Sequence, residues 1–223
     1  MQDILTIADH MAVAVFAVTG ALMASRKQMD IFSFVMLGTV TGVGGGSLRD
    51  LLLDVPVFWV SAPSYVMTCV TAAALTYFLA HLVQSRYRVI LWLDAVGLAL
   101  FAVLGAEKAL TVEAVPVIAV VMGVMSSTFG GIIRDVVSGE VPLLLRREIY
   151  VTAALAGSVV FVAMVTGFGL DIRIAGASGF VCCFAVRGFA LRFGWSLPTY
   201  KSQPGRTQEE LEEIGVLSKD DES

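Results

Sequence analysis

Charged side chains are scarce in this sequence of 223 residues, and their scarcity excludes an ordinary soluble globule. Only 15% of the residues are charged, whereas 57% are apolar and the mean hydropathy is +0.82. A typical soluble domain carries about 25% charged and roughly 45–50% apolar residues. The polar groups needed to cover a water-exposed surface are therefore missing, and we expect the chain to lie in a lipid bilayer.

An excess of positive charge is also missing. The net charge of -4 comes from the segment after residue 193, which holds three basic and seven acidic residues, so residues 1–193 are neutral. Without a basic surface, no nucleic-acid partner is expected. A cleaved signal peptide has basic residues before its apolar run, and the first apolar segment of this chain has none. We therefore expect this segment to remain as a membrane span.

Groups for catalysis and metal binding are few. The two histidines lie in unrelated stretches and the three cysteines show no metal-ligand spacing, so we expect neither a zinc site nor a disulfide framework. The segment GVGGGS at 42–47 lacks the lysine of a phosphate-binding loop. No nucleophile, base and orienting group can be assembled, and we expect neither an enzyme nor a cofactor.

Long apolar runs dominate the rest of the sequence. Because about 20 apolar residues cross the hydrocarbon core as a helix, the runs predict an all-α membrane domain at 1–193 followed by a polar acidic tail at 194–223. The seven expected spans are approximately 4–23, 31–53, 64–83, 89–105, 114–137, 149–170 and 174–191.

Lysine and arginine gather in alternate connections between these spans. They occur in the first, third and fifth connections and after the last span, whereas the even connections hold mostly acidic residues. Positive residues favour the cytoplasmic side. The N-terminus is therefore expected outside and the acidic tail in the cytoplasm.

The chain repeats itself at a distance of 85 residues. Aligning 4–82 with 89–167 without a gap gives 16 identities in 79 positions, and charged residues and glycines fall in one register. Each copy holds three spans, so the second copy must enter the membrane from the opposite side. Such inverted repeats usually place the functional site near the midplane, between the copies. The seventh helix stands outside the repeat.

Glycines interrupt the middle span of each copy. Each glycine costs about 1 kcal/mol relative to alanine in a helix interior, so we expect a kink or local unwinding there. Freed carbonyls and nearby hydroxyls would then replace part of the hydration shell of a passing potassium or sodium ion. The alternative is a packing role, in which small residues only bring helices close. The expected kink and pore residues are Gly44, Gly45, Gly46, Gly130 and Gly131, with hydroxyls from Thr41, Ser47, Ser126, Ser127 and Thr128.

An Arg-Asp pair follows each glycine group. A lone charge near the bilayer centre costs about 2.5–3.5 kcal/mol on insertion scales, so these residues need partners. Adjacent helical residues point about 100° apart, and we expect the partners to come from the other copy or from the aspartates that begin the first and fourth spans. A structural clamp and contact with a permeant ion both remain open, and Asp9 has the alternative of complementing a helix N-terminus. The six charges are Arg49, Asp50, Arg134, Asp135, Asp9 and Asp94.

These motifs resemble the trimeric intracellular cation (TRIC) channels and their prokaryotic homologues, a group that overlaps glycine-transporter-like membrane proteins. The resemblance covers residues 4–193 and rests on GVGGGSLRD at 42–50 and STFGGIIRD at 127–135. Phe129 stands where a third glycine would match the first copy.

The resemblance implies a homotrimer in which each protomer carries a pore for monovalent cations, chiefly potassium, in the bacterial inner membrane. In the family the pore is lined by the first, second, fourth and fifth helices. The rival hypothesis is a secondary transporter for a small amino acid such as glycine, for which an inverted repeat is equally suitable. A scaffold without transport would leave the charges within the spans unexplained.

Overall fold

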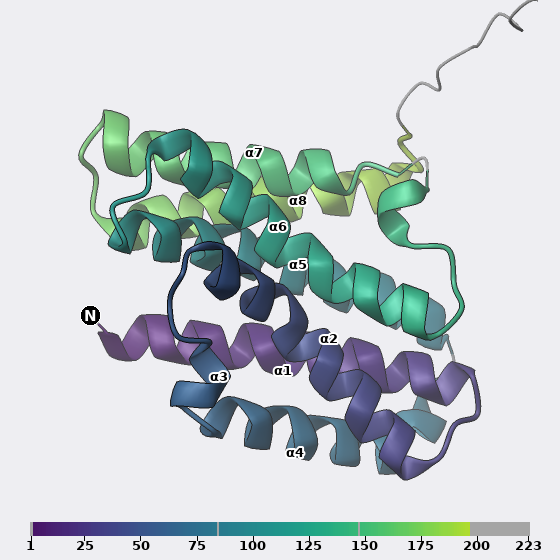
Figure 1. Ribbon diagram of the computed structural model, residues 1–223. Helices are drawn as coiled ribbons and strands as arrows, with labels where there is room; N and C mark the ends of the chain where they lie inside the picture. Colours follow the sequence, from purple (N-terminus) through teal and green to yellow (C-terminus); the bar gives the residue numbers. More distant parts are fainter. Residues whose placement is uncertain (1, 84, 147, 197–223) are drawn as a thin grey trace, which may run out of the picture.

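The chain folds into a bundle of long helices, seen in a computed structural model that describes residues 2–83, 85–146 and 148–196 (Figure 1). The longer helices are α1 (Gln2–Arg26), α2 (Ile31–Leu52), α4 (Ser64–Leu79), α5 (Arg86–Thr111), α6 (Pro116–Val137), α7 (Val151–Val162) and α8 (Ile172–Phe193). The short elements are α3 (Phe58–Ser61), η1 (Ala80–Leu82), η2 (Leu143–Leu145) and the π-helical turn η3 (Ala163–Gly167). The predicted all-α membrane fold is confirmed. From residue 197 on, the predicted acidic tail lies outside the described residues.

Local chemistry sets several helix ends. The Asp30 side chain accepts a hydrogen bond from the backbone N–H of Ser33 and so caps α2. Pro116 occupies the first turn of α6, where no helical N–H partner is needed. Gly194 ends α8 in the left-handed conformation, with φ of 68°.

In the part of the chain that the structure describes, six helices are long and apolar enough to cross a membrane, namely α1, α2, α4 extended by η1, α5, α6 and α8. The sixth predicted span, at 149–170, is the shorter apolar stretch of α7 and η3, Val151–Gly167. Many large apolar side chains are exposed on the flanks of the bundle, among them Phe32, Met36, Val117 and Phe168. Such a surface suits lipid rather than water.

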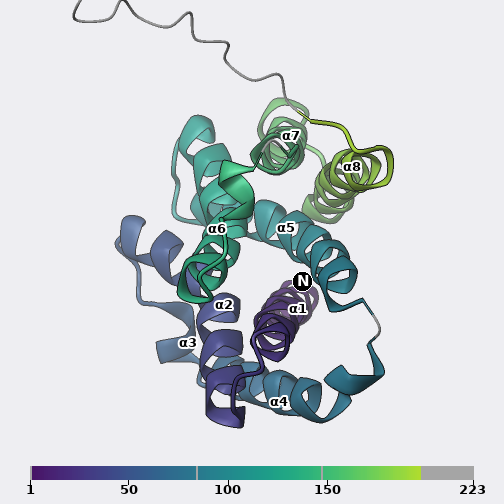
Figure 2. The ribbon, with the colours of Figure 1, turned by 90° about the vertical axis from the view of Figure 1, so that its right-hand side faces the viewer.

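The centre of the bundle is made by α1, α2, α5 and α6. In Figure 2, which looks along the helices, α1 lies beside α5 and α2 beside α6. Helix α4 packs on α1 and α2, whereas α7 and α8 pack on α5, and α7 also contacts α6. The beginning of α1 and the end of α8 lie at opposite ends of the bundle (Figure 1).

Candidate functional site

Glycines allow α2 and α6 to cross at very short range. A methyl group added at Gly45 would collide with the carbonyl oxygen of Ser126, and one at Gly130 would lie 2.5 Å from the carbonyl oxygen of Thr41. Both helices run without interruption through these glycines. The predicted local unwinding is therefore absent from both helices. The glycines instead allow the two backbones to pack closely, because a side chain at Gly45 or Gly130 would not fit. A bend within the continuous helices stays a prediction.

The remaining glycines of the two motifs also face neighbours. A methyl group at Gly44 would lie 2.8 Å from Ile133 Cδ1, and one at Gly46 would lie 2.6 Å from the ring of Phe58. One at Gly131 would lie 2.9 Å from the Tyr150 hydroxyl and 3.5 Å from Asp94 Oδ1. Gly131 thus leaves room for a polar cluster rather than for a neighbouring backbone.

Most of the predicted hydroxyls bond to their own helix. Ser47 donates to the Val43 carbonyl at 2.7 Å and accepts from Trp59 Nε1 at 2.8 Å. Ser127 and Thr128 both donate to the Val124 carbonyl. The exception is Ser126, whose buried Oγ has no hydrogen-bond partner among the described residues. Most of the hydroxyls expected to face a passing ion are therefore bonded within their own helix in this conformation.

Each arginine of the two Arg-Asp pairs bonds to the aspartate next to it. Arg49 donates from Nε and Nη2 to Asp50 Oδ1, both at 2.8 Å. Arg134 does the same to Asp135 Oδ1, both at 2.9 Å. The expectation that neighbours could not satisfy each other was wrong, and the cross-repeat pairs Arg49 with Asp135 and Arg134 with Asp50 do not form. The long arginine stem lets the guanidinium fold back to a carboxylate that the helix itself directs elsewhere.

The second oxygen of each aspartate holds the segment that follows its helix. Asp50 Oδ2 accepts from the Phe58 N–H at 2.9 Å, and Asp135 Oδ2 accepts from the Leu143 N–H at 3.1 Å. Phe58 and Leu143 begin α3 and η2 and are themselves 85 residues apart. The two copies therefore share a buried Arg-Asp unit bonded to a following short helix, although neither α3 nor η2 was expected from the sequence.

The second unit has two further partners, of which one, Asp94, was among the predicted alternatives. Arg134 Nη1 lies 2.7 Å from Asp94 Oδ1 and 3.1 Å from Thr19 Oγ1, and Arg134 is 1% exposed. Asp9, which corresponds to Asp94, makes no ion pair with Arg49 among the described residues, and its own side chain is half-buried. Thr19 was missed in the sequence because its counterpart is Leu104, so the repeat gave no signal.

Two buried oxygens beside Arg134 lack hydrogen-bond partners in the described part of the chain. They are Asp94 Oδ2 and the hydroxyl of Tyr150, a residue 1% exposed. Buried polar atoms without partners are rare and call for an explanation. With Ser126 Oγ, they place oxygen atoms among α5, α6 and the start of α7, inside a membrane protein. Tyr150 repeats Tyr65 at the 85-residue spacing, which is the signal in the sequence that marks this tyrosine.

Arg187 of α8 completes the surroundings of Tyr150. It is 1% exposed, donates from Nη2 to Glu148 at 2.6 Å and from Nη1 to the Ile149 carbonyl at 3.2 Å, and lies 5.2 Å from the Tyr150 ring centroid. Its position near the end of the last span is typical of an arginine that extends to the membrane surface, but Glu148 and the Ile149 carbonyl provide partners inside the bundle.

Known proteins share both the sequence and this architecture. The family model described as "Glycine transporter" matches twice, at residues 6–81 and 91–166. The inner membrane protein YadS of Escherichia coli (strain K12) is 42% identical over 197 residues, which is 86% of this chain and 94% of that protein. A membrane protein of Vibrio cholerae is 39% identical over 203 residues, 89% of this chain and 83% of that protein.

Solved structures of other proteins are also similar to this chain. The TRIC trimeric intracellular cation channel orthologue from Rhodobacter sphaeroides has a TM-score of 0.84 and 55% identity, covering 86% of this chain and 99% of that one. The chain belongs to the TRIC cation channel family. A second TRIC cation channel structure has a TM-score of 0.79 and 31% identity, over 90% of this chain and 98% of that one. The expected family is confirmed, and with it the expectation that the protein is not an enzyme.

Proposed function

We propose that this TRIC protein is a monovalent cation channel that conducts potassium through a pore in each protomer of a homotrimer. The support is its likeness to a trimeric cation channel at 55% identity, together with the buried oxygens where α5 and α6 meet. Carboxylate and hydroxyl oxygens can replace part of a cation's water shell at weak successive sites. Potassium or sodium would be the permeant ion near Gly44–Gly46 and Gly130–Gly131, with no resident cofactor.

The path would run between α1, α2, α5 and α6, the helices at the centre of the bundle. The side chain of Arg134 fills this region in the present conformation, bonded to Asp94, Asp135 and Thr19. A cation close to that guanidinium would be repelled. Conduction therefore requires Arg134 to move, and Asp94 would then expose a carboxylate to the path.

Seven spans as two inverted three-helix copies form part of the proposal, with α7 and η3 as the sixth span and α8 outside the repeat. The support is the pair of matching Arg-Asp units and the family model that fits twice. The ends of the described chain lie at opposite ends of the bundle, as an odd number of crossings requires (Figure 1).

The bacterial inner membrane is the proposed location, with the N-terminus outside, because the E. coli relative is named an inner membrane protein. Single cysteines introduced at Glu113 and at Glu140 would test the orientation in spheroplasts. A membrane-impermeant maleimide should label the first without permeabilisation and the second only after it. The reverse pattern would invert the topology.

Purified protein in planar bilayers tests the channel directly. Stepwise single-channel currents that reverse at the potassium equilibrium potential are expected. Crosslinking in detergent should give a trimer, and a monomer that still conducts would remove the trimer from the proposal.

A secondary transporter for a small amino acid is the second candidate. The "Glycine transporter" family model favours it, as does the unequal pairing of the two Arg-Asp units, which alternating access would produce. Saturable glycine uptake into liposomes without unitary currents would replace the channel by this function.

A further inference from the structure

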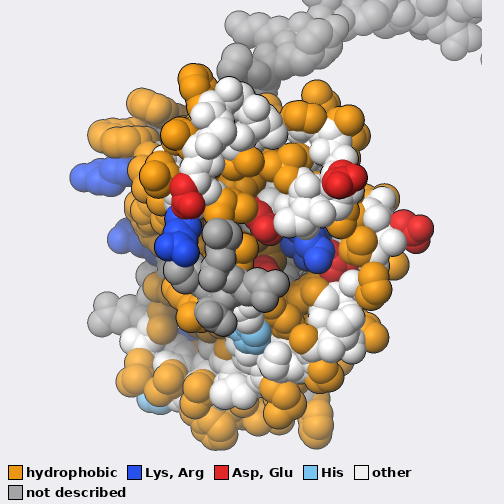
Figure 3. Space-filling view, turned by 90° about the vertical axis from the view of Figure 1, so that its left-hand side faces the viewer, with side chains coloured by type: hydrophobic (Ala, Val, Ile, Leu, Met, Phe, Trp, Pro, Cys, Tyr) orange, Lys and Arg blue, Asp and Glu red, His pale blue; other side chains and the backbone are white. Residues whose placement is uncertain are grey.

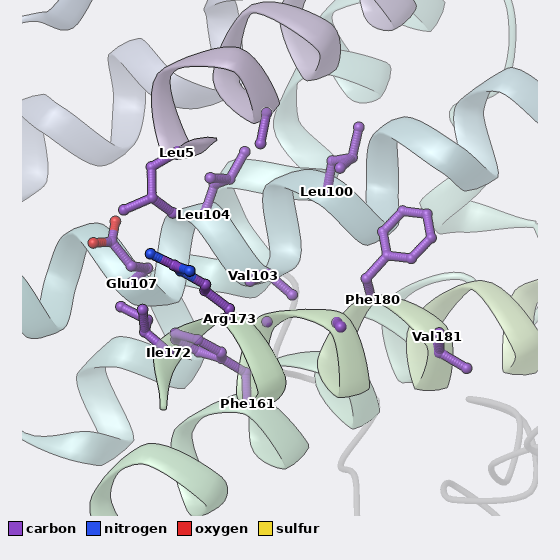
Figure 4. A pocket seen from close by; sticks show the side chains of 13 residues that line it. Leu5, Leu100, Val103, Leu104, Glu107, Phe161, Ile172, Arg173, Phe180 and Val181 are labelled. Atoms are coloured by element: carbon purple, nitrogen blue, oxygen red, sulfur yellow. The ribbon is translucent and has the colours of Figure 1, made fainter. Parts of the chain in front are cut away.

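A cavity of about 290 Å³ lies among the start of α1, the second half of α5, α7 and the first half of α8. Its walls are mainly apolar, with Leu5, Leu100, Phe161 and Phe180 among them (Figure 4). Its volume is nearly twice that of a roughly 150 Å³ cavity that holds a benzene ring. A slot of this size and polarity suits an alkyl chain.

Small side chains keep the cavity open. Ala8, Gly176 and Ala177 all belong to its lining. A methyl group added at Gly176 would meet only Val103 Cγ1, at an ordinary 3.6 Å. The glycine is therefore not required by a close helix contact, in contrast to Gly45 and Gly130, and a larger residue there would enter the cavity.

One acidic and one basic residue lie at the same end of the slot, Glu107 from α5 and Arg173 from α8 (Figure 4). Neither side chain makes a hydrogen bond or an ion pair with another described residue. This end is the one at which α1 begins, α5 ends and α8 begins, so it lies at the level of lipid headgroups. Figure 3 looks onto this face, where acidic and basic side chains lie among apolar ones.

We propose that the slot binds one phospholipid with a primary amine in its headgroup. One of its two acyl chains occupies the apolar cavity, the phosphate binds Arg173 and the ammonium binds Glu107. The guanidinium fork matches a phosphate, and an ammonium offers three N–H donors to a carboxylate. A choline headgroup has no such donor, and a headgroup that is only anionic would place no cation at Glu107.

Native mass spectrometry of the full-length protein in detergent tests the proposal with three probes: phosphatidylethanolamine, phosphatidylcholine and phosphatidylglycerol of matched acyl chains. The amine lipid should bind about tenfold more tightly than the choline lipid, as expected for a charge-assisted hydrogen bond. Equal binding of the three lipids would overturn the proposal.

Three substitutions separate the parts of the site. Gly176→Leu fills the slot and should abolish binding of every lipid to it, whereas Glu107→Gln should remove the preference for the amine and keep residual binding. Arg173→Gln should weaken the ethanolamine and choline lipids together. Ile174→Phe enlarges an exposed residue of the same helix outside the cavity and should change nothing.

If Gly176→Leu does not fold, the lipid selectivity of Glu107→Gln alone tests the proposed lipid site. Retention of the ethanolamine preference in that variant contradicts the proposal. If Gly176→Leu folds, binds the lipid normally and changes the oligomeric state, the cavity is a subunit contact and the proposal fails.

Discussion

Arg134 is bonded to Asp94 at 2.7 Å, whereas Arg49, its counterpart in the first copy, makes no ion pair with Asp9. Both arginines hold the aspartate that follows them, so the difference lies in the third partner. The second unit is closed by Asp94 and Thr19 and is fully buried. The first leaves Asp9 half-buried near the end at which α1 begins. The two units, although matched in sequence, therefore differ in their bonding partners and in their burial within the same structure.

This inequality predicts different costs for two matched substitutions. Asp94→Asn removes a buried, charge-assisted partner of Arg134 and should lower the free energy of unfolding by about 1.5–3 kcal/mol. Asp9→Asn removes no ion pair and should cost less than about 1 kcal/mol. Denaturation titrations in mixed detergent micelles measure both. Equal losses would show that the two units are equally paired in the membrane.

The crossing of α2 and α6 predicts that glycine substitutions differ by position. Gly45→Ala places a methyl group on the Ser126 carbonyl oxygen and should destabilise by about 1–3 kcal/mol through overpacking. Gly188→Ala, in the interior of α8, meets only the Trp92 ring at 3.5 Å. It should be neutral or stabilise by up to about 1 kcal/mol, because alanine is the better helix former.

Thermal unfolding midpoints in detergent compare the two variants. A Gly45→Ala protein as stable as the wild type would show that α2 and α6 can separate freely, and would return the glycine motif to the unwound form that the sequence suggested.

Apolar runs and the 85-residue repeat were enough to predict the helices and to select the charged residues. They did not predict interactions that depend on a contact between two particular side chains. The sequence does not show that an arginine stem can fold back from Arg49 to Asp50, nor that Thr19 reaches Arg134 across 115 positions. Glycine carries the same ambiguity, because a break in a helix and a close helix crossing both require it. Only the contacts around Gly45 in the structure distinguish a helix break from a close helix crossing.

Arg187 shows a different limit. A position near the end of the last span is typical of a residue that reaches the membrane surface, yet Glu148 lies 39 positions away from Arg187 in sequence and 2.6 Å away in space. Ion pairs between distant segments leave no periodic signal, and Arg187 has no counterpart in the repeat.

The pair of Glu148 and Arg187 predicts a large effect from a partly exposed carboxylate. Glu148→Gln leaves the buried Arg187 without its counter-ion and should cost about 3 kcal/mol, since breaking a buried pair strands a charge. The control is Glu140→Gln, in a cluster with Lys27, Arg26 and Arg146, all partly exposed. It should cost less than about 1 kcal/mol. If both variants lose equal stability, the Arg187 side chain has another route to solvent.

Glu140 also predicts a pH dependence at the basic end of the bundle. A hydrogen bond from Lys27 and the charges of Lys27, Arg26 and Arg146 lower the pKa of Glu140 below its ordinary value of 4.5. A depressed carboxylate pKa contributes stability above the unfolded-state value and loses it as the pH falls through the folded-state value. The wild type should therefore exceed Glu140→Gln in unfolding midpoint by a small constant amount above about pH 4.5, and the difference should shrink below it.

High salt should reduce the difference at neutral pH, because the pairs are partly exposed. A difference that grows on acidification would mean that Glu140 is stabilised in its protonated form, contrary to its contacts with three cations.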